Sequence, residues 1–416
     1  MKKVFFFAAT ALLLAACSND EFNAPEVAQD APQAVAFDTY VPAATRAGAA
    51  GVMTTTTLQT TGFGVFAQQG ADYAAVNGAN FMYNQQVTIE NSAWTYTPLK
   101  YWPNETATDN NGATSTDTEG LSFFAYAPYV SEASGSTGIT GMSAKDDATD
   151  PTITYTVASK PSESVDLLWG VAPTGGLSYT NVANTTTTVS DGLPLIDLLK
   201  PAKEQKIKFL FKHALARLGM TVVAAVDQIP AGGTLGTGTK IYVNSIKITD
   251  AATTATIPSS AKLNLNNTTA GVALWTDAVT SARFTCTINS SNELNEDLQG
   301  SATVQTKKGV TTSETAVLAD GNYLMLIPTP GTAATLEVEI DYIVITNDSK
   351  LNAGYAVTQN VIKKTVTLTS GTSAGFTNNK AYNLKLILGM TSVKLDAEVA
   401  EWEIAGSTEV DLPKNK

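Results

Sequence analysis

Short segments in which apolar and polar residues alternate recur from residue 35 toward the C-terminus. Val35, Phe37 and Val41 share one parity, and residues 153–157 and 336–346 repeat the pattern. A period of two is typical of strands with one buried face. No stretch longer than about three turns has the period of an amphipathic helix. With 416 residues and frequent Gly, Asn and Asp turns, the chain is predicted to be all-β, with two β-sandwich domains in tandem.

The boundary between these two domains is predicted between residues 200 and 201. Pro194, Pro201 and four lysines between residues 200 and 208 interrupt the strand pattern there. The first domain would span residues 35–200 and the second residues 201–416. The alternating segment 207–215 is predicted to open the second domain.

The N-terminus has the order of parts found in a bacterial lipoprotein precursor. Two lysines precede an apolar run at residues 4–16, which is too short to cross a bilayer of about 30 Å. Small residues then lead directly to Cys17, as in a lipobox. We therefore predict a signal peptide at residues 1–16, acyl chains on Cys17 that anchor it to membrane lipid, and a flexible tether at residues 17–34. The acidic segment 18–21 resembles a surface-export signal.

Charge and rare residues exclude several classes of function. The net charge of −12 is unfavourable for contact with nucleic-acid phosphates. The only histidine, His213, and Cys286 both lie in alternating segments and are predicted to be buried core residues. The acidic loop that begins at Asp109 has Gly120 where a calcium loop needs a glutamate. We predict no cofactor, no metal site and no enzymatic activity.

A stretch of small residues follows the first predicted strand. Residues 43–51 contain two glycines and no large apolar side chain, so we expect an exposed loop that proteases can reach. Arg46, one of only three arginines in the chain, lies in this loop before Ala47. From the residues alone, Arg46 fits an ordinary arginine in a surface linker, and a specific cut at the Arg46–Ala47 bond is predicted only through the family resemblance given below.

Several short motifs, in this order, resemble the fimbrillin family, the lipoproteins of Bacteroidota that polymerise into type V pili. Each motif is weak by itself, but together they extend over nearly the whole chain. They lie at residues 45–47, 63–67, 94, 100–103, 121–128, 166–170, 211–218, 326–328 and 400–402.

The resemblance implies two transthyretin-like β-sandwich domains and an assembly route. The precursor would be an outer-membrane lipoprotein exposed at the cell surface, and an Arg-specific surface protease would cut after Arg46. The strand that leaves would carry Val35, Phe37 and Val41. A strand from another copy or a related pilin would fill the groove by donor-strand exchange, and the product would be a fimbrium that supports adhesion.

The candidate donor strand lies at residues 393–412, where apolar residues alternate and then change parity at Trp402. Its apolar residues are Val393, Leu395, Val399, Trp402, Ile404, Val410 and Leu412. The same residues also fit the last strand of the second domain. Whether the chain is a stalk, tip or anchor subunit stays open at this point.

Two other functions compete with a pilus subunit. The chain could be a permanently anchored surface lipoprotein that binds glycans or host ligands, or a surface glycan hydrolase. Trp94, Tyr101 and Trp102 are the aromatic residues that could stack on sugars, but their alternation favours core packing.

Overall fold

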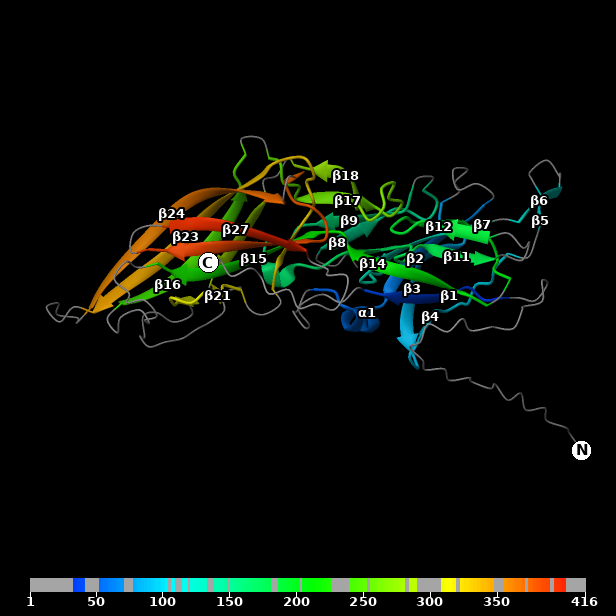
Figure 1. The fold of residues 1–416 in the computed structure, drawn as a ribbon, viewed down its shortest axis with the longest axis horizontal. Helices are drawn as coiled ribbons and strands as arrows, with labels where there is room; N and C mark the ends of the chain where they lie inside the picture. Colours follow the sequence, from blue (N-terminus) through cyan, green and yellow to red (C-terminus); the bar gives the residue numbers. More distant parts are fainter. Residues whose placement is uncertain are drawn as a thin grey trace, which may run out of the picture.

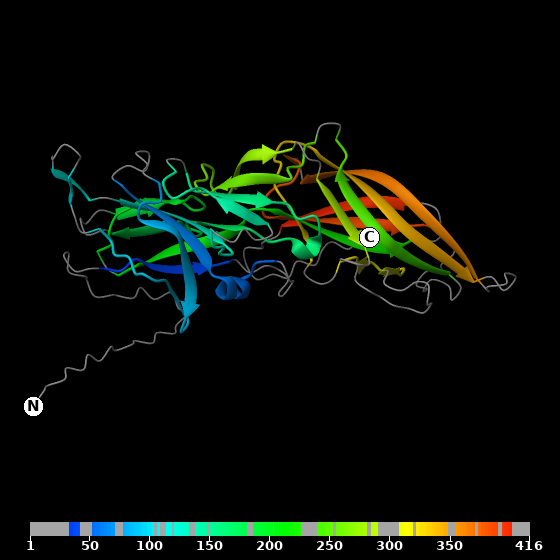
Figure 2. The ribbon, with the colours of Figure 1, turned by 180° about the vertical axis from the view of Figure 1, so that it is seen from behind.

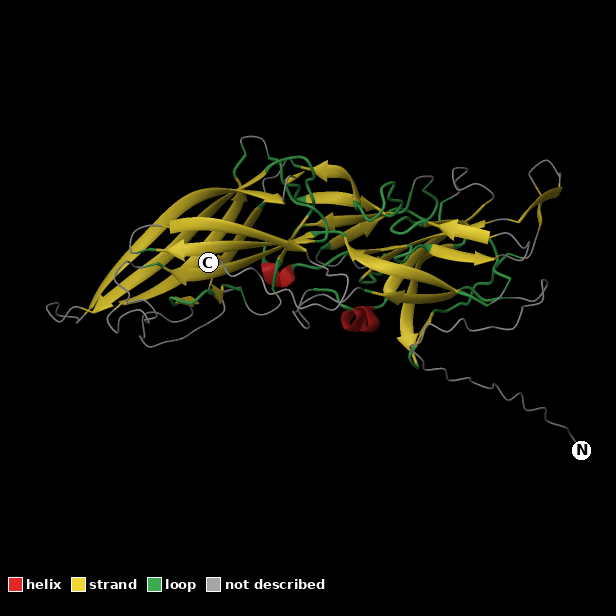
Figure 3. Cartoon of the chain, viewed as in Figure 1, coloured by secondary structure: helices red, strands yellow, loops and turns green. Residues whose placement is uncertain are grey.

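The structure is a computed structural model in which most of the chain beyond the N-terminal segment is described. The described residues are 33–41, 52–70, 78–103, 106–108, 114–118, 120–132, 138–147, 150–180, 186–202, 204–225, 239–252, 255–280, 284–289, 308–318, 322–347, 355–370, 373–389 and 393–401. Strands form nearly all of the regular structure (Figure 3).

An eight-stranded sheet forms the centre of one end of the elongated molecule (Figure 1). Its order is β1 (Ala36–Tyr40), β14 (Lys206–His213), β10 (Leu168–Val171), β7 (Gly120–Ala127), β2 (Phe63–Gly70), β3 (Met82–Glu90) and β4 (Ala93–Thr95), with β13 (Leu195–Leu198) paired to β7. A four-stranded sheet packs on it, in the order β18 (Leu274–Val279), β17 (Ser260–Asn264), β9 (Thr152–Thr156) and β8 (Ile139–Met142).

Smaller elements surround these sheets. They are the hairpin of β5 (Thr106–Thr108) and β6 (Thr114–Thr118), the hairpin of β11 (Leu177–Thr180) and β12 (Thr186–Val189), helix α1 (Thr55–Thr61) and the 3-10 turn η1 (Pro161–Glu163).

Two further sheets enclose the core of the other end (Figure 2). One has the order β21 (Thr315–Ala316), β15 (Ala216–Ala224), β26 (Lys380–Leu388) and β27 (Val393–Glu401), with β22 (Leu324–Leu326) paired to β15. The other has the order β19 (Thr285–Asn289), β16 (Thr239–Asp250), β23 (Ala334–Asn347), β24 (Tyr355–Ser370) and β25 (Ser373–Ala374), with β20 (Lys308–Val310) paired to β16.

The central strands β2 and β7 of the eight-stranded sheet are buried on both faces. All eight residues of β7 and the first six of β2 are buried, and both strands are apolar on both parities. Phe63 and Phe123 face one core, whereas Phe66 and Phe124 face the core shared with the four-stranded sheet. A strand covered on both faces loses the alternation seen in half-buried strands. The all-β sandwich fold predicted from the sequence is confirmed.

The predicted boundary between residues 200 and 201 does not separate the sheets. Strand β14 was expected to open the second domain, but it pairs with β1 and β10 inside the eight-stranded sheet. Farther along the chain, β17 returns to the same end and pairs with β9. Local alternation identified these strands but carries no information about which sheet they join.

Two polar segments that are rich in threonine also form strands. Residues 104–120 include the short strands β5 and β6, and the threonine run at residues 185–188 lies largely in β12. Threonine is β-branched and favours extended backbone, so these polar segments can pair although they lack an apolar face.

Candidate functional site

Strand β1 lies at the edge of the eight-stranded sheet and pairs with β14 in parallel, with Ala36 opposite Lys206 and Tyr40 opposite Leu210. Side chains of the parity predicted to face inward are buried: Val35 and Phe37 are 1% exposed and Val41 is 3% exposed. We call the site that holds this strand the β1 groove. Its floor is formed by Phe63, Tyr96, Phe123 and Phe209.

Phe37 is the deepest contact between β1 and its groove. Its ring centroid lies 5.5 Å from that of Tyr96 and 6.0 Å from that of Phe123. It meets Phe63 edge-on at 6.1 Å and stacks on Phe209 at 6.1 Å. Aromatic pairs at these spacings add to the stabilisation from buried area, so one residue supplies much of the apolar contact of β1.

The edge of β1 that faces away from β14 is also bonded at its start. The Val35 amide donates to the Lys100 carbonyl at 2.9 Å, and the Trp102 amide donates to the Gln33 carbonyl at 2.9 Å. Ala34 lies opposite Tyr101 in this antiparallel bridge. The entry into β1 is therefore held on its outer edge by residues 100–102.

Side chains add three hydrogen bonds along this outer edge. The Tyr96 hydroxyl donates to the Val35 carbonyl at 2.8 Å, and the Thr55 hydroxyl of α1 donates to the Val41 carbonyl at 3.0 Å. Between them, the Asp38 carboxylate accepts from the Thr39 amide at 2.9 Å. Burial raises the pKa of Tyr96 to about 12, so its phenol keeps its proton, and can donate it in a hydrogen bond, to a higher pH than an exposed tyrosine.

The chain is anchored on both sides of the segment that contains the predicted cleavage site. Val41 is fixed by Thr55, while Val52 and Met53 are buried where the described chain resumes. Arg46 and Ala47 lie outside the described residues. The bond between Val41 and Thr55 brings the two ends of the intervening segment close together.

A buried carboxylate that is hydrogen-bonded to His213 holds the downstream anchor. The Asp166 carboxylate accepts from the Met53 amide at 2.8 Å and lies 2.7 Å from His213 Nδ1. Both side chains are fully buried, so His213 is a core residue, as predicted. The sequence showed no sign of its pairing with Asp166, because the two residues are distant in the chain.

The described part of the candidate donor segment is an ordinary edge strand of its own subunit. β27 pairs antiparallel with β26. Leu395 and Val399 are partly buried and pack against the hydrophobic core that lies between the sheets of β26 and β23. Strand β27 lies toward the opposite end of the molecule from β1 (Figures 1 and 2). Within one subunit, the structure does not bring the two segments together.

The remaining candidate residues divide into buried, exposed and undescribed ones. Trp102 is buried and Trp94 packs against the core, but Tyr101 is 50% exposed, contrary to the expectation of core packing. Cys286 is buried, as predicted. Residues that lie outside the described part of the chain are Cys17, Asp109, Trp402, Ile404, Val410 and Leu412.

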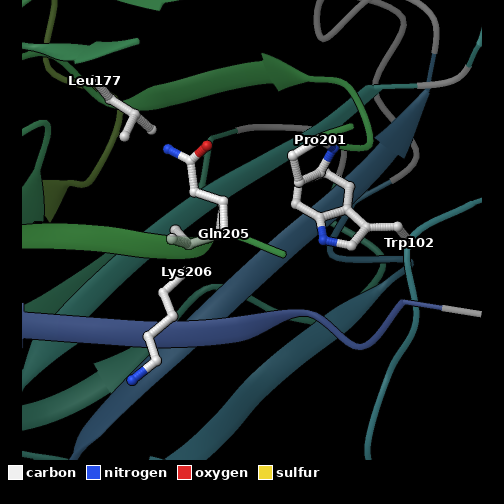
Figure 4. A pocket seen from close by; sticks show the side chains of 6 residues that line it. Trp102, Leu177, Pro201, Gln205 and Lys206 are labelled. Carbon is white, nitrogen blue, oxygen red and sulfur yellow. The ribbon is translucent and has the colours of Figure 1, made fainter. Parts of the chain in front are cut away.

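A narrow hollow opens at the start of β14, beside the beginning of the β1 groove (Figure 4). It is lined by Trp102, Leu177, Pro201, Gln205, Lys206 and Ile207. It is too narrow to admit a ligand.

The described residues offer no cluster of three or more His, Cys, Asp or Glu side chains that could hold a metal ion. None of the described helices has the length and hydropathy of a membrane span. The β1 groove is therefore the strongest candidate site.

Comparison with known proteins shows that the chain is similar to fimbrial proteins. The chain is 26% identical to fimbrium subunit Fim1C of Phocaeicola vulgatus over 430 aligned residues, which cover 97% of each protein. The chain resembles a fimbrial subunit along its whole length. This confirms the resemblance to the fimbrillin family, and the relative is a structural protein rather than an enzyme, as predicted for this chain.

A solved structure supports the same fold. The crystal structure of a fimbrial protein from Bacteroides vulgatus matches with a TM-score of 0.60 and 24% sequence identity, covering 89% of this chain and 99% of that one. No protein-family model matches the chain.

Proposed function

We propose that the chain is a structural subunit of a cell-surface fimbrium that polymerises when another copy replaces β1 in its groove. The precursor would reach the outer membrane as a lipoprotein through Cys17. An Arg-specific surface protease would cut the Arg46–Ala47 bond. The observation that carries this proposal is the docking of β1, with Val35, Phe37 and Val41 buried, directly before the predicted cleavage segment.

Cleavage would act by removing an entropic advantage. While β1 is covalently attached, its effective concentration at the groove is on the order of millimolar, which favours it over any strand from another molecule. After cleavage β1 can leave, and the groove then exposes apolar pockets and the free edge of β14. A strand that refills three such pockets regains roughly 1.5–3 kcal/mol for each buried side chain.

The C-terminal segment has a sequence suited to the vacated groove. Residues 35–41 read VAFDTYV and residues 393–399 read VKLDAEV. The two segments share Val, Asp and Val at their first, fourth and seventh positions, and Leu395 matches Phe37 at the third. In this register, every side chain directed into the groove is apolar or small. This match supports residues 393–399 as the donor.

Burial and position favour insertion into a second copy. Leu395 and Val399 are only partly buried in their own sheet, whereas Phe37 and Val41 are almost fully buried in the groove. In the groove these two side chains would be more fully buried than in their own sheet, where β26 holds β27 on only one edge. Because donor and groove lie toward opposite ends, each copy would bind the next head to tail, which produces an open filament.

Replacement of Arg46 by Ala tests the proposal. After treatment with an Arg-specific protease, the unmodified chain should yield a product that begins at Ala47 and forms ladders on non-denaturing gels. The Arg46→Ala variant should fold normally and remain monomeric, because β1 stays attached. The matched control is Thr45→Ala, which changes the same segment but keeps the arginine and should polymerise.

Two results would count against the proposal. Filaments from the Arg46→Ala chain would show that release of β1 is not required. Clean cleavage that yields only monomers would favour the alternative function, a permanently anchored surface lipoprotein that binds glycans or host ligands.

A peptide experiment tests the donor separately. A synthetic peptide of residues 391–401, added in excess during cleavage, should occupy the vacated groove and shorten the filaments. The same peptide with Leu395→Asp should not, because a carboxylate would enter the aromatic floor of the groove at a cost of several kcal/mol. Filament length measured by electron microscopy with each peptide decides between these outcomes, and equal lengths would exclude this register.

A further inference from the structure

We infer that the β1 groove selects its occupant along the strand's outer edge. The hydroxyls of Tyr96 and Thr55 hold carbonyls at its two ends, and the strand itself must supply an acceptor side chain at the position of Asp38. This inference rests on the proposed function, in which a strand of another copy replaces β1, and it adds what the groove requires of that strand. Its contacts are present in the uncut chain, however, and they are tested there without any cleavage.

The outer edge needs such contacts because, among the described strands, β1 pairs with β14 alone. In a strand, the amide and carbonyl of one residue point to the same side, and this side alternates along the chain. The outward amide of Val35 bonds to Lys100, which places the carbonyls of Val35 and Val41 on the side away from β14. Buried backbone groups left without partners cost about 1–3 kcal/mol each.

Tyr96 and Thr55 meet this need from fixed positions. The Tyr96 ring packs 5.5 Å from the Phe37 ring and is 5% exposed, so its hydroxyl is held over the start of the strand. Thr55 is the first residue of α1, and that helix is fixed by the Thr54 cap and by buried Leu58. Within residues 35–41 both hydroxyls bond to backbone carbonyls, so they can hold any strand that lies in the same register. The Tyr96 hydroxyl also accepts from the Lys100 amide at 3.3 Å, which helps to fix its position.

The Asp38 carboxylate caps the amide of the next residue within β1 itself. Among the described residues, Asp38 supplies the acceptor for this amide and the groove supplies none, so the occupant has to bring its own acceptor. Asp396 occupies the same position in the segment 393–399. The shared aspartate therefore has a role in the groove that the apolar pattern alone does not explain.

Hydrogen–deuterium exchange of the uncut chain tests the two hydroxyls. In Tyr96→Phe and in Thr55→Val, exchange in peptides that cover residues 33–41 should rise about two- to tenfold, the loss expected for one hydrogen bond. The matched controls are Tyr101→Phe and Thr56→Val, which change the same residue types at side chains that are exposed to solvent. These controls should exchange like the unmodified chain. Unchanged exchange in both test variants would overturn the role of the hydroxyls.

Substitutions of Asp38 test the requirement on the strand. Asp38→Ala should raise exchange of the Thr39 amide by a similar factor, whereas Asp38→Asn retains an acceptor oxygen and should restore most of the protection. Equal protection in all three chains would overturn the requirement for an acceptor.

Peptide competition then connects the requirement to the donor. Peptides of residues 391–401 with Asp396, Asp396→Asn or Asp396→Ala should inhibit filament growth in that order of potency. If the exchange results hold but no peptide inhibits growth, the groove contacts stand and the proposed polymerisation fails. If all three peptides inhibit equally, the donor does not use the acceptor and the inference fails for the exchanged strand.

Discussion

Replacement of Phe37 by Ala is expected to weaken the binding of β1 to its groove by about 3–5 kcal/mol, the usual cost of deleting a buried phenylalanine side chain. The ring is 1% exposed and contacts four other aromatic rings, so no neighbour can easily move to fill the space. A loss of about 3 kcal/mol is more than a hundredfold in affinity. After cleavage, the variant strand should dissociate at least a hundredfold faster, as measured by release of the N-terminal fragment over time.

Phe37→Leu is the matched control for this experiment. Leucine stands at the equivalent position of the candidate donor, Leu395, and an apolar replacement of similar size usually costs less than about 1.5 kcal/mol. The Leu variant should therefore retain its fragment much longer than the Ala variant. Equal release from both variants would mean that the aromatic floor does not determine how long β1 stays bound.

Replacement of Asp166 by Ala is expected to destabilise the end of the molecule that contains the β1 groove by about 3–5 kcal/mol. The Asp166 carboxylate is the hydrogen-bond partner of both His213 and the Met53 amide, and both side chains of the pair are fully buried. Its removal leaves two buried polar groups without this acceptor. The free energy of unfolding from urea titration measures the loss.

Asp166→Asn and Asp146→Ala show whether the loss in free energy of unfolding comes from the missing acceptor at Asp166 or from removal of a carboxylate in general. The Asn variant keeps an acceptor oxygen in the same place, so its loss should be smaller than that of the Ala variant. Asp146 is exposed, and its replacement should change the free energy of unfolding by less than about 0.5 kcal/mol. A loss below about 1 kcal/mol for Asp166→Ala would show that His213 and Met53 find other partners.

The sequence predicted best those features that arise from local pattern. The alternation of Val35, Phe37 and Val41 gave both the strand and its inward face, because burial on one face requires that period. The position of His213 among apolar residues correctly indicated burial. The absence of long amphipathic periods indicated an all-β chain, and α1 is only seven residues long.

Features that depend on pairing between distant segments were not predictable in the same way. Nothing in the alternation of β14 shows that its neighbour is β1 rather than a strand of the other end. The hydroxyl of Tyr96 lies 61 residues from its partner Val35, and the contact between Asp166 and Met53 spans 113 residues. Such contacts depend on tertiary geometry, which a single sequence does not encode locally.

The chain crosses between the two ends of the molecule to place β17 and β18, and this path has a mechanical consequence. The chain passes from the eight-stranded sheet to β15, returns after β16 to pair β17 with β9, and passes over again from β18 to β19. Three covalent connections therefore bridge the two ends, and the ladder between β17 and β9 joins segments more than a hundred residues apart. A pulling force along the long axis would be shared among these parallel paths, so the two halves resist being torn apart even when the leading strand is gone.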